Sequence, residues 1–312
     1  MRFFSNIPVW AYELAITLSA MIWGGSFVVL KGAVNAMPPG WLLALRFAAS
    51  SLVVAVAFRA RVTGSLDGSH LLAGVLVGLP LGVGYLIQNI GLIEISPGRN
   101  AFLTATYCVM VPFLNWAATH VRPRANNLLA ALVVLAGVGL LSMDGELGPS
   151  LSRGDLLTLA SALMFATNIV LVGRLGSAHD AVTITVVSLA TSSLVCLGYA
   201  LHAEALPAPG ALPLGFWGQM LYLVFLSTIF ATLAQNVGQR HVDPSKTALL
   251  LSLESVFAVL FSVIFYGELL TPRLVLGFAL IFAAVLVSEL MVPRVRERSA
   301  DPVAESSDRG RR

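Results

Sequence analysis

Two glutamine–asparagine pairs stand at corresponding places in the two halves of the chain and could bind a polar solute. Gln88 and Asn89 open the stretch QNIGLIEISPGRNAFLTATY, and Gln235 and Asn236 open QNVGQRHVDPSKTALLLSLE, 147 positions later. Amide side chains donate and accept hydrogen bonds without carrying charge, so in an apolar segment they can line a pocket or tie helices together. We expect these pairs to line a pocket, with helix packing as the alternative.

Glu254 is an acid in an otherwise apolar stretch, LLLSLESVFAVL, with no Lys or Arg within a helical turn. Burial without a partner disfavours the charged form of a carboxyl, so we expect Glu254 to be protonated at rest. A carboxyl that gains and loses a proton as its surroundings change could couple a process to a proton gradient. The alternative is a protonated structural carboxyl that donates one hydrogen bond to a neighbouring helix.

Aromatic and basic residues add to the candidate site. Trp23, in the motif WGGSF, could stack on an aromatic or cationic ligand, or could belong to the core. Tyr85 shares one helical face with Gln88 and Asn89, because the three residues are spaced at i, i+3 and i+4. Arg46 is expected near the outer edge of the hydrocarbon, either snorkelling to the interface or facing a cavity as a fixed positive charge.

The composition identifies the environment that must hold these residues. The chain has 312 residues, of which 57% are hydrophobic and 11% are charged, whereas soluble domains carry about 25% charged residues. Runs of roughly 20 apolar residues alternate with short polar breaks, and such runs are long enough to cross a bilayer as helices. The predicted fold class is therefore an all-α integral membrane protein.

Ten transmembrane spans are predicted, numbered here in chain order. They are Glu13–Ala33, Trp41–Phe58, His70–Leu92, Gly98–Thr119, Ala125–Met143, Asp155–Leu175, Ala181–His202, Gly215–Gln239, Lys246–Tyr266 and Pro272–Val292.

An internal duplication relates the first five spans to the second five. Besides the amide pairs, Pro97 meets Pro244 at the same spacing, and SSLV at Ser50–Val53 recurs as SSLV at Ser192–Val195. Because five is an odd number, the two units must enter the bilayer from opposite sides, as two inverted five-helix repeats. The predicted domains are a first repeat at 1–144, a second repeat at 150–292, and a disordered basic cytoplasmic tail at 293–312.

The distribution of Lys and Arg predicts the orientation. With the N-terminus inside, and without counting the tail, eight of them lie on the cytoplasmic side and four on the other, which favours cytoplasmic termini. No GxSxG, HExxH or Walker motif is present, and the two cysteines form no metal-binding pair. We therefore expect no enzyme activity, no cofactor, no metal and no nucleic-acid partner.

Several motifs carry a resemblance to a known family. They are WGGSF, LALRF at Leu43–Phe47, QNIGL at Gln88–Leu92 and SLESVFAVLFSVIFYGELLTPRLVLGFALIFAAVLV at Ser252–Val287. With the ten-span duplicated layout, the chain resembles the EamA-type transporters of the drug/metabolite transporter superfamily over roughly residues 13–292. Where that family often has proline after the Leu-Glu pair, this chain has Ser255, so we expect span nine to be straighter.

The resemblance implies a multi-pass carrier of the plasma membrane that works by alternating access and draws its cavity from spans one, three, four, six, eight and nine. The candidate substrate-binding residues on those spans are Trp23, Tyr85, Gln88, Asn89, Tyr107, Asn168, Gln235 and Asn236, with Glu254 as the proton-coupling candidate and Arg46 as a candidate charge in the cavity.

The expected function is secondary active transport of small organic metabolites or drugs, with amino acids among the candidate solutes. Export coupled to protons is favoured. A channel or lipid-flipping protein of the same fold, or a non-transporting membrane scaffold, are the alternatives. The expected partners are a small-molecule substrate and the lipid bilayer, and a monomer would suffice because both halves of the cavity come from one chain.

Overall fold

The computed structural model describes residues 7–120, 122–123, 125–142, 152–206, 212–266 and six positions between 272 and 283, and the regular secondary structure of these residues is entirely helical. The predicted tail at 293–312 and most of the predicted tenth span, Pro272–Val292, lie outside these residues.

Eight segments of the described chain are helical, long and apolar enough to cross a membrane. Six predicted spans match α1 (Val9–Ala36), α2 (Pro39–Ala57), α4 (Gly68–Glu94), α5 with α6 (Pro97–Thr104 and Tyr107–Thr119), α8 (Arg153–Leu175) and α9 (Ala181–Ala203). The other two match α10, η1 and α11 (Leu214–Leu221, Tyr222–Phe230 and Ala231–Gly238) and α12 with α13 (Pro244–Leu251 and Leu253–Tyr266). The chain is thus a multi-pass membrane protein, while the count of ten spans stays a prediction.

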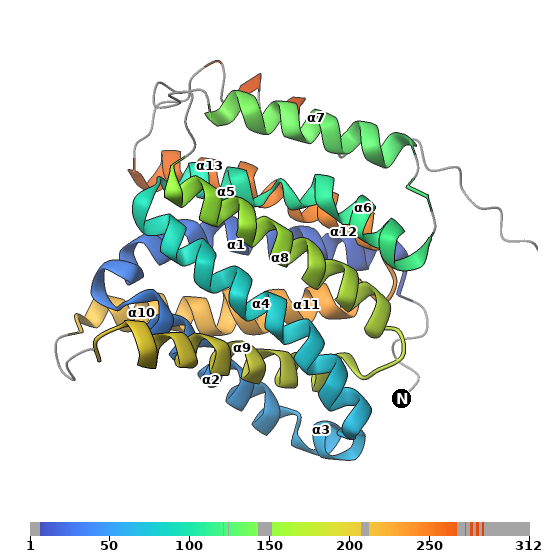
Figure 1. Ribbon diagram of the computed structural model, residues 1–312, viewed down its shortest axis with the longest axis vertical. Coiled ribbons are helices and arrows are strands. Elements are labelled where there is room, and N and C mark those ends of the chain that lie inside the picture. The colour runs from blue at the N-terminus through green and yellow to red at the C-terminus, as the bar shows by residue number, and fades with distance from the viewer. Residues whose placement is uncertain are drawn as a thin grey trace, which may run out of the picture.

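Two further helices complete the described part of the chain. The short α3 (Arg59–Ser65) follows α2, and α7 (Ala125–Ser142) covers most of the predicted fifth span. In Figure 1, α4 and α8 run side by side through the middle of the bundle, with α2 and α9 along one side and α5, α6 and α13 along the other.

Span nine contains a one-residue turn between two helices, and its expected straightness relative to family members with proline stays a prediction. Its first helix ends at Leu251 and the second begins at Leu253, with a turn at Ser252. The Ser252 hydroxyl donates to the Leu249 carbonyl at 2.6 Å, and the Ser255 hydroxyl donates to the Ser252 carbonyl at 2.8 Å. Serine hydroxyls that bind backbone carbonyls compete with the helical ladder and bend it, so proline is not needed for the break.

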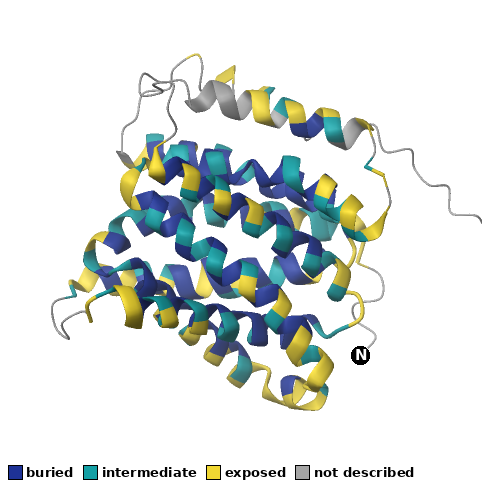
Figure 2. Ribbon diagram, in the orientation of Figure 1, coloured by how far each residue is buried: buried dark blue, intermediate teal, exposed yellow. Residues whose placement is uncertain are grey.

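Small residues bring the two halves of the chain into close contact. A Cβ atom on Gly78 of α4 would lie 2.5 Å from the Ser188 carbonyl oxygen of α9, and one on Gly82 would lie 2.7 Å from the Ser192 Cα. The Ser192 hydroxyl also donates to the Gly78 carbonyl at 3.0 Å. Glycine seams of this kind drive helix association in lipid, where packing replaces the hydrophobic effect. Buried residues accordingly lie on the faces that helices turn toward one another (Figure 2).

Candidate functional site

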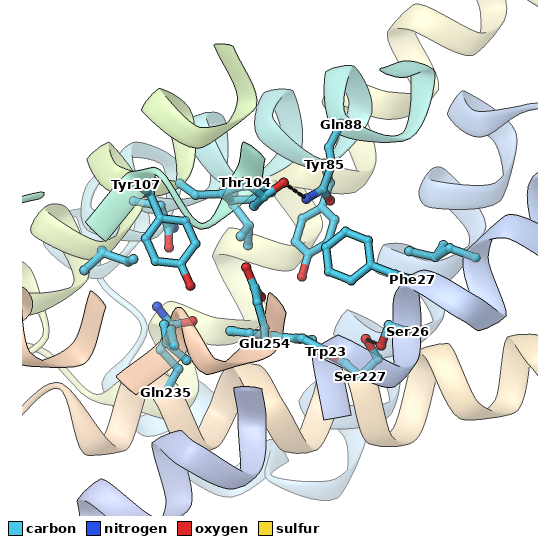
Figure 3. Close-up of a pocket in the computed structure, with 16 residues that line it drawn as sticks. Trp23, Ser26, Phe27, Tyr85, Gln88, Thr104, Tyr107, Ser227, Gln235 and Glu254 are labelled. Atoms are coloured by element: carbon cyan, nitrogen blue, oxygen red, sulfur yellow. Dashed lines mark hydrogen bonds between the residues drawn. The ribbon is translucent and has the colours of Figure 1, made fainter. Parts of the chain in front are cut away.

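A cavity of about 50 Å³ lies in the middle of the helix bundle, between segments of both halves of the chain. Six of the predicted spans contribute to its wall, through α1, α4, α5 and α6, α8, η1 and α11, and α12 and α13. Its lining residues are Trp23, Ser26, Phe27, Leu30, Leu81, Tyr85, Gln88, Thr104, Tyr107, Phe165, Asn168, Ile169, Ser227, Gln235, Leu251 and Glu254 (Figure 3).

Twelve of these sixteen residues form six pairs at corresponding positions of the duplication. At the spacing of 147, three pairs of lining residues come from spans three, four, eight and nine: Gln88 with Gln235, Thr104 with Leu251, and Tyr107 with Glu254. At the spacing of 142, three more come from spans one and six: Trp23 with Phe165, Ser26 with Asn168, and Phe27 with Ile169. Each half of the chain therefore contributes lining residues from corresponding positions to the cavity wall.

The centre of the cavity holds unsatisfied polar groups. Figure 3 shows the polar ends of Tyr85, Tyr107, Gln235 and Glu254 pointing toward the same space. The Tyr107 hydroxyl and the Glu254 Oε1 atom are buried, and neither makes a hydrogen bond of normal geometry with a described residue, although the two side chains lie close enough to interact with each other. Leaving a buried polar atom unpaired costs about 1–3 kcal/mol, so polar groups with unused hydrogen-bonding capacity face this space.

A glycine in the first helix places Glu254 at this centre. A Cβ atom on Gly24 would lie 2.7 Å from the Glu254 carbonyl oxygen and 2.6 Å from Phe257 Cβ. The motif WGGSF therefore lets α1 approach the backbone of α13 closely. The same approach sets the Trp23 ring and the Glu254 carboxyl on one wall of the cavity.

The two glutamines are held in place by neighbours. The Gln88 side chain donates from Nε2 to the Thr104 hydroxyl at 2.9 Å, and the Gln88 backbone carbonyl accepts from Asn100 Nδ2 at 3.2 Å. In the other half, Gln235 donates from Nε2 to Gln239 Oε1 at 2.9 Å, and Gln239 in turn donates to the Ile169 carbonyl at 3.0 Å. Both side-chain amides are thus held in fixed orientations in the cavity wall.

The asparagine of each amide pair lies outside the lining. Asn89 donates from Nδ2 to the Tyr85 carbonyl of its own helix at 2.8 Å, and Asn236 donates to the Thr185 hydroxyl of α9 at 2.8 Å. Consecutive residues point about 100° apart around a helix, so one member of each pair faces the cavity and the other faces a neighbouring helix. The structure thus places Gln88 and Gln235 in the wall and the two asparagines in helix packing.

Trp23 and Asn168 line the cavity, while their side-chain nitrogens donate to backbone carbonyls of neighbouring helices. The Trp23 indole nitrogen donates to the Ser227 carbonyl at 2.7 Å, and Ser26 donates to the Ser227 hydroxyl at 2.7 Å, which fastens α1 to η1. Asn168 donates from Nδ2 to the Val77 carbonyl of α4 at 2.9 Å. The Trp23 ring therefore offers a stacking surface in a fixed orientation.

Arg46 is fully buried, at 0% exposure, which contradicts the snorkelling alternative. Its Nε atom donates to the Thr228 hydroxyl at 2.6 Å and its Nη2 atom to the Ser227 hydroxyl at 2.9 Å. The guanidinium carbon lies 5.0 Å from the centre of the Tyr85 ring, a cation–π distance. Arg46 is not a lining residue, but both Ser227 and Tyr85 are, so it places a positive charge directly behind the wall.

The π-helical turn η1 creates this arrangement. Thr228 donates its hydroxyl to the Leu223 carbonyl, five residues earlier, at 2.8 Å, while accepting from Arg46. Single π-helical turns inside α-helices are frequently found at functional sites. In this segment the Ser227 carbonyl accepts from the Trp23 indole, and Ser227 and Thr228 present two hydroxyls to one guanidinium.

Sequence reasoning missed nine lining residues. The spacing of the duplication could have found four of them, since Trp23 and Asn168 predict Phe165 and Ser26 as partners, and Phe27 and Ile169 lie one residue further on. Ser227 had no such signal, because its place depends on the π-helical turn. The nine are Ser26, Phe27, Leu30, Leu81, Thr104, Phe165, Ile169, Ser227 and Leu251.

A multi-pass helical fold around a central cavity lined by both halves is an architecture suited to a membrane transporter. The sequence model of the EamA-like transporter family matches this chain twice, at residues 10–143 and 152–290. The chain belongs to the EamA-like transporter family, and this membership points to transport rather than catalysis.

Known relatives agree with this assignment. An uncharacterized transporter of Archaeoglobus fulgidus is 29% identical over 260 residues, covering 83% of this chain and 80% of the relative. The uncharacterized transporter YoaV of Bacillus subtilis is 24% identical over 272 residues, covering 85% of this chain and 91% of the relative. A solved crystal structure that is 20% identical matches 92% of this chain with a TM-score of 0.74 and has the same fold.

Proposed function

We propose that this protein is a secondary active transporter that exports small organic solutes across the plasma membrane by alternating access. Amine-bearing metabolites or drugs, amino acids among them, are the solutes that suit a wall of amides, phenols, an indole and one acid. The observation that carries the proposal is the six pairs of cavity residues at corresponding positions of the two halves.

The matched wall supports alternating access for a physical reason. If the halves, near 1–144 and 150–292, are inverted copies, exchanging their conformations turns an inward-open state into an outward-open state of similar energy. A site between the copies is then reached from one side at a time. In this proposal both termini are cytoplasmic, as the distribution of Lys and Arg favours.

Glu254 is proposed to couple transport to protons. Its Oε1 atom is buried without a hydrogen bond of normal geometry to a described residue, and it faces the same space as the Tyr107 hydroxyl. A solute amine that enters this space supplies hydrogen-bond donors and a positive charge, which favour the ionised carboxylate. Solute and proton then compete for one carboxyl, and this competition couples their movements in opposite directions.

The test is efflux measured in inverted membrane vesicles against a panel of amino acids and cationic drugs, with and without a pH gradient. We expect at least one solute to move against its gradient, and Glu254→Gln to abolish only the proton-driven part. Glu94→Gln is the control, because Glu94 pairs with Arg153 at the end of α4, away from the cavity. Continuous conductance in a planar bilayer without saturable counterflow would contradict the proposal, as would a Glu254→Gln protein that transports like the wild type.

A further inference from the structure

Two ion pairs join the halves of the chain at their helix starts. Arg99 near the start of α5 binds Asp155 near the start of α8 through two contacts, Nε to Oδ1 at 2.7 Å and Nη2 to Oδ2 at 2.8 Å. Lys246 near the start of α12 binds Glu13 of α1, with 2.5 Å between Nζ and Oε1. Each pair links one helix of the first half to one of the second.

The two pairs are equivalents of each other under the duplication. Arg99 corresponds to Lys246 at the spacing of 147, and Glu13 corresponds to Asp155 at the spacing of 142. The first half supplies the base of one pair and the acid of the other. The two ion pairs are therefore copies of one another: in one pair the first half supplies the base, and in the other pair it supplies the acid.

The pairs lie at opposite ends of the bundle. Asp155 stands at the start of α8, and Gly173 stands near its end. A Cβ atom on Gly173 would lie 2.5 Å from Pro244, the first residue of α12, so the start of α12 lies beside the end of α8. At 1.5 Å per residue, roughly 27 Å of helix axis separates the two ends.

Each base is carried by a short helix that ends at the cavity. Arg99 lies in α5, which stops at Thr104, and Lys246 lies in α12, which stops at Leu251; both helices have eight residues. Thr104 and Leu251 both line the cavity. The breaks that follow, at Ala105 and Ser252, also correspond at the spacing of 147. A short helix can tilt about such a break while the rest of its span stays packed.

We propose that Arg99–Asp155 and Lys246–Glu13 are the alternating closures of the cavity, positioning residues that hold one end shut while the other end opens. This inference rests on the proposed function. An ion pair suits a reversible closure because water that enters on opening solvates the separated charges and offsets the lost attraction. The helix break, the ion pair and the cavity residues then form one moving unit in each half.

The two closures differ in strength. The Arg99–Asp155 pair is bidentate, and Asp155 is 0% exposed and also accepts from the Ser152 backbone and hydroxyl at 2.8 and 2.9 Å. The side chains of Lys246 and Glu13 are 24% and 19% exposed. Bidentate guanidinium–carboxylate pairs are stronger than the contact of an ammonium point charge. In the proposed orientation the end at Lys246 is the cytoplasmic end.

The experiment measures access to the cavity from each face separately. Full-length protein carrying Cys108→Ser, Cys196→Ser and Leu81→Cys, the last a lining position, is labelled with a membrane-impermeant thiol reagent in right-side-out and in inverted vesicles. We expect Arg99→Gln to speed labelling from the Arg99 end and slow it from the other end, each by about fivefold, and Lys246→Gln to do the reverse.

Two exposed ion pairs provide matched controls. Arg153 pairs with Glu94 at the Arg99 end, and Arg61 pairs with Asp180 at the Lys246 end. Arg153→Gln and Arg61→Gln should leave labelling from both faces unchanged. The inference is overturned if either control reproduces the sided change, or if Arg99→Gln and Lys246→Gln change access from the same face or not at all.

A second measurement keeps the test decisive if a neutralised variant does not fold. Cross-linking of a Glu13→Cys, Lys246→Cys pair with a bifunctional thiol reagent, whose spacer replaces the two long side chains, should lock that end, so that labelling proceeds only from the Arg99 end. Labelling from both faces after cross-linking would refute the closure. Labelling needs no solute. Opposite shifts in labelling without any solute flux would therefore refute the proposed function alone, and unchanged labelling with intact flux would refute the closures alone.

Discussion

Spans four and nine occupy corresponding places in the two halves, and their ends are alike while their centres differ. Each begins with a proline after a capping side chain, since Ser96 accepts from the Arg99 backbone and Asp243 accepts from the Ser245 backbone. Each then carries a base paired to the other half. At the cavity, however, span four presents Tyr107 and span nine presents Glu254.

This difference separates two requirements of a transporter. In the proposed mechanism, equivalent helix ends let each half close one end of the cavity with the same kinds of elements, although the two ion pairs differ in geometry and exposure. The solute and the proton need one specific chemical group, which a duplicated pair would only supply twice. The starts of spans four and nine therefore carry equivalent residues, whereas their cavity positions carry different residues, Tyr107 and Glu254.

The contacts of α2 and α9 show a second difference between the halves. Arg46 of α2 binds the hydroxyls of η1, whereas the corresponding Ser188 of α9 lies against Gly78 in the glycine seam of α4. One contact is polar and charged, and the other is a close backbone approach. The positive charge behind the cavity wall thus belongs to the first half, and the acid in the wall belongs to the second.

Substitution in the glycine seam is expected to give the largest effect. Gly78→Ala places a methyl group 2.5 Å from the Ser188 carbonyl oxygen, so backbone must move, and the free energy of unfolding should fall by about 1–3 kcal/mol. Gly198→Ala is the control, because nothing lies within 4 Å of a Cβ there. Denaturant titration in detergent measures the free energy of unfolding of both variants. Equal losses of stability would show that close packing at Gly78 does not limit the size of the side chain there.

Exchanging the central residues tests whether the halves are chemically interchangeable. In the double variant Tyr107→Glu, Glu254→Tyr, the acid leaves the wall beside Trp23, and proton-driven efflux should fall by about tenfold, or about 1.4 kcal/mol. Tyr107→Phe, which removes only the hydroxyl, is the comparison. If the exchanged protein transports as well as the parent, the asymmetry of the centre has no role in coupling.

Thr104 has a hydrogen-bonding role that its counterpart Leu251 cannot share. Thr104→Val removes the acceptor for Gln88 Nε2, so the free energy of unfolding should fall by about 0.6–1.5 kcal/mol. Thr167→Val is the control, since that hydroxyl bonds the Leu163 carbonyl of its own helix. Thermal melting of the purified variants compares them, and a larger loss for Thr167→Val would contradict the assigned role of Thr104.

The smallest effect is expected where α2 and α9 begin. Glu204 binds the first N–H groups of α2 from the other half, whereas α9 begins with its own cap, Asp180. Burial raises the pKa of Asp180, but hydrogen bonds from Arg61 and Thr183 outweigh it, so the net pKa is lowered. Asp180→Asn should therefore cost a few tenths to about 1 kcal/mol of stability at neutral pH.

The pH dependence of this cost checks its origin. A carboxyl whose pKa is lowered on folding stabilises the protein above its unfolded pKa and loses that contribution as the pH falls through the folded value. The stability difference between wild type and Asp180→Asn should accordingly shrink below about pH 4. Melting curves between pH 3 and pH 7 measure it, and a constant difference would assign the cost to side-chain packing.

The sequence by itself determined the membrane class, the positions of eight described spans and the duplication. These features depend on composition, on the length of apolar runs and on internal similarity, none of which requires knowledge of packing. The duplication also singled out Gln88 and Gln235, and the isolated charge in an apolar run singled out Glu254; all three line the cavity.

Only the tertiary structure decided which side chains meet. A helical pattern fixes neighbours three and four residues apart, but it does not say which face meets which helix, so it left both members of each amide pair as candidates. The burial of Arg46 depends on hydroxyls that lie 181 and 182 residues away, on a π-helical turn without a sequence signature. The ion pairs Arg99–Asp155 and Lys246–Glu13 likewise form only when two apolar halves pack together, because packing in three dimensions, not spacing along the chain, sets those distances.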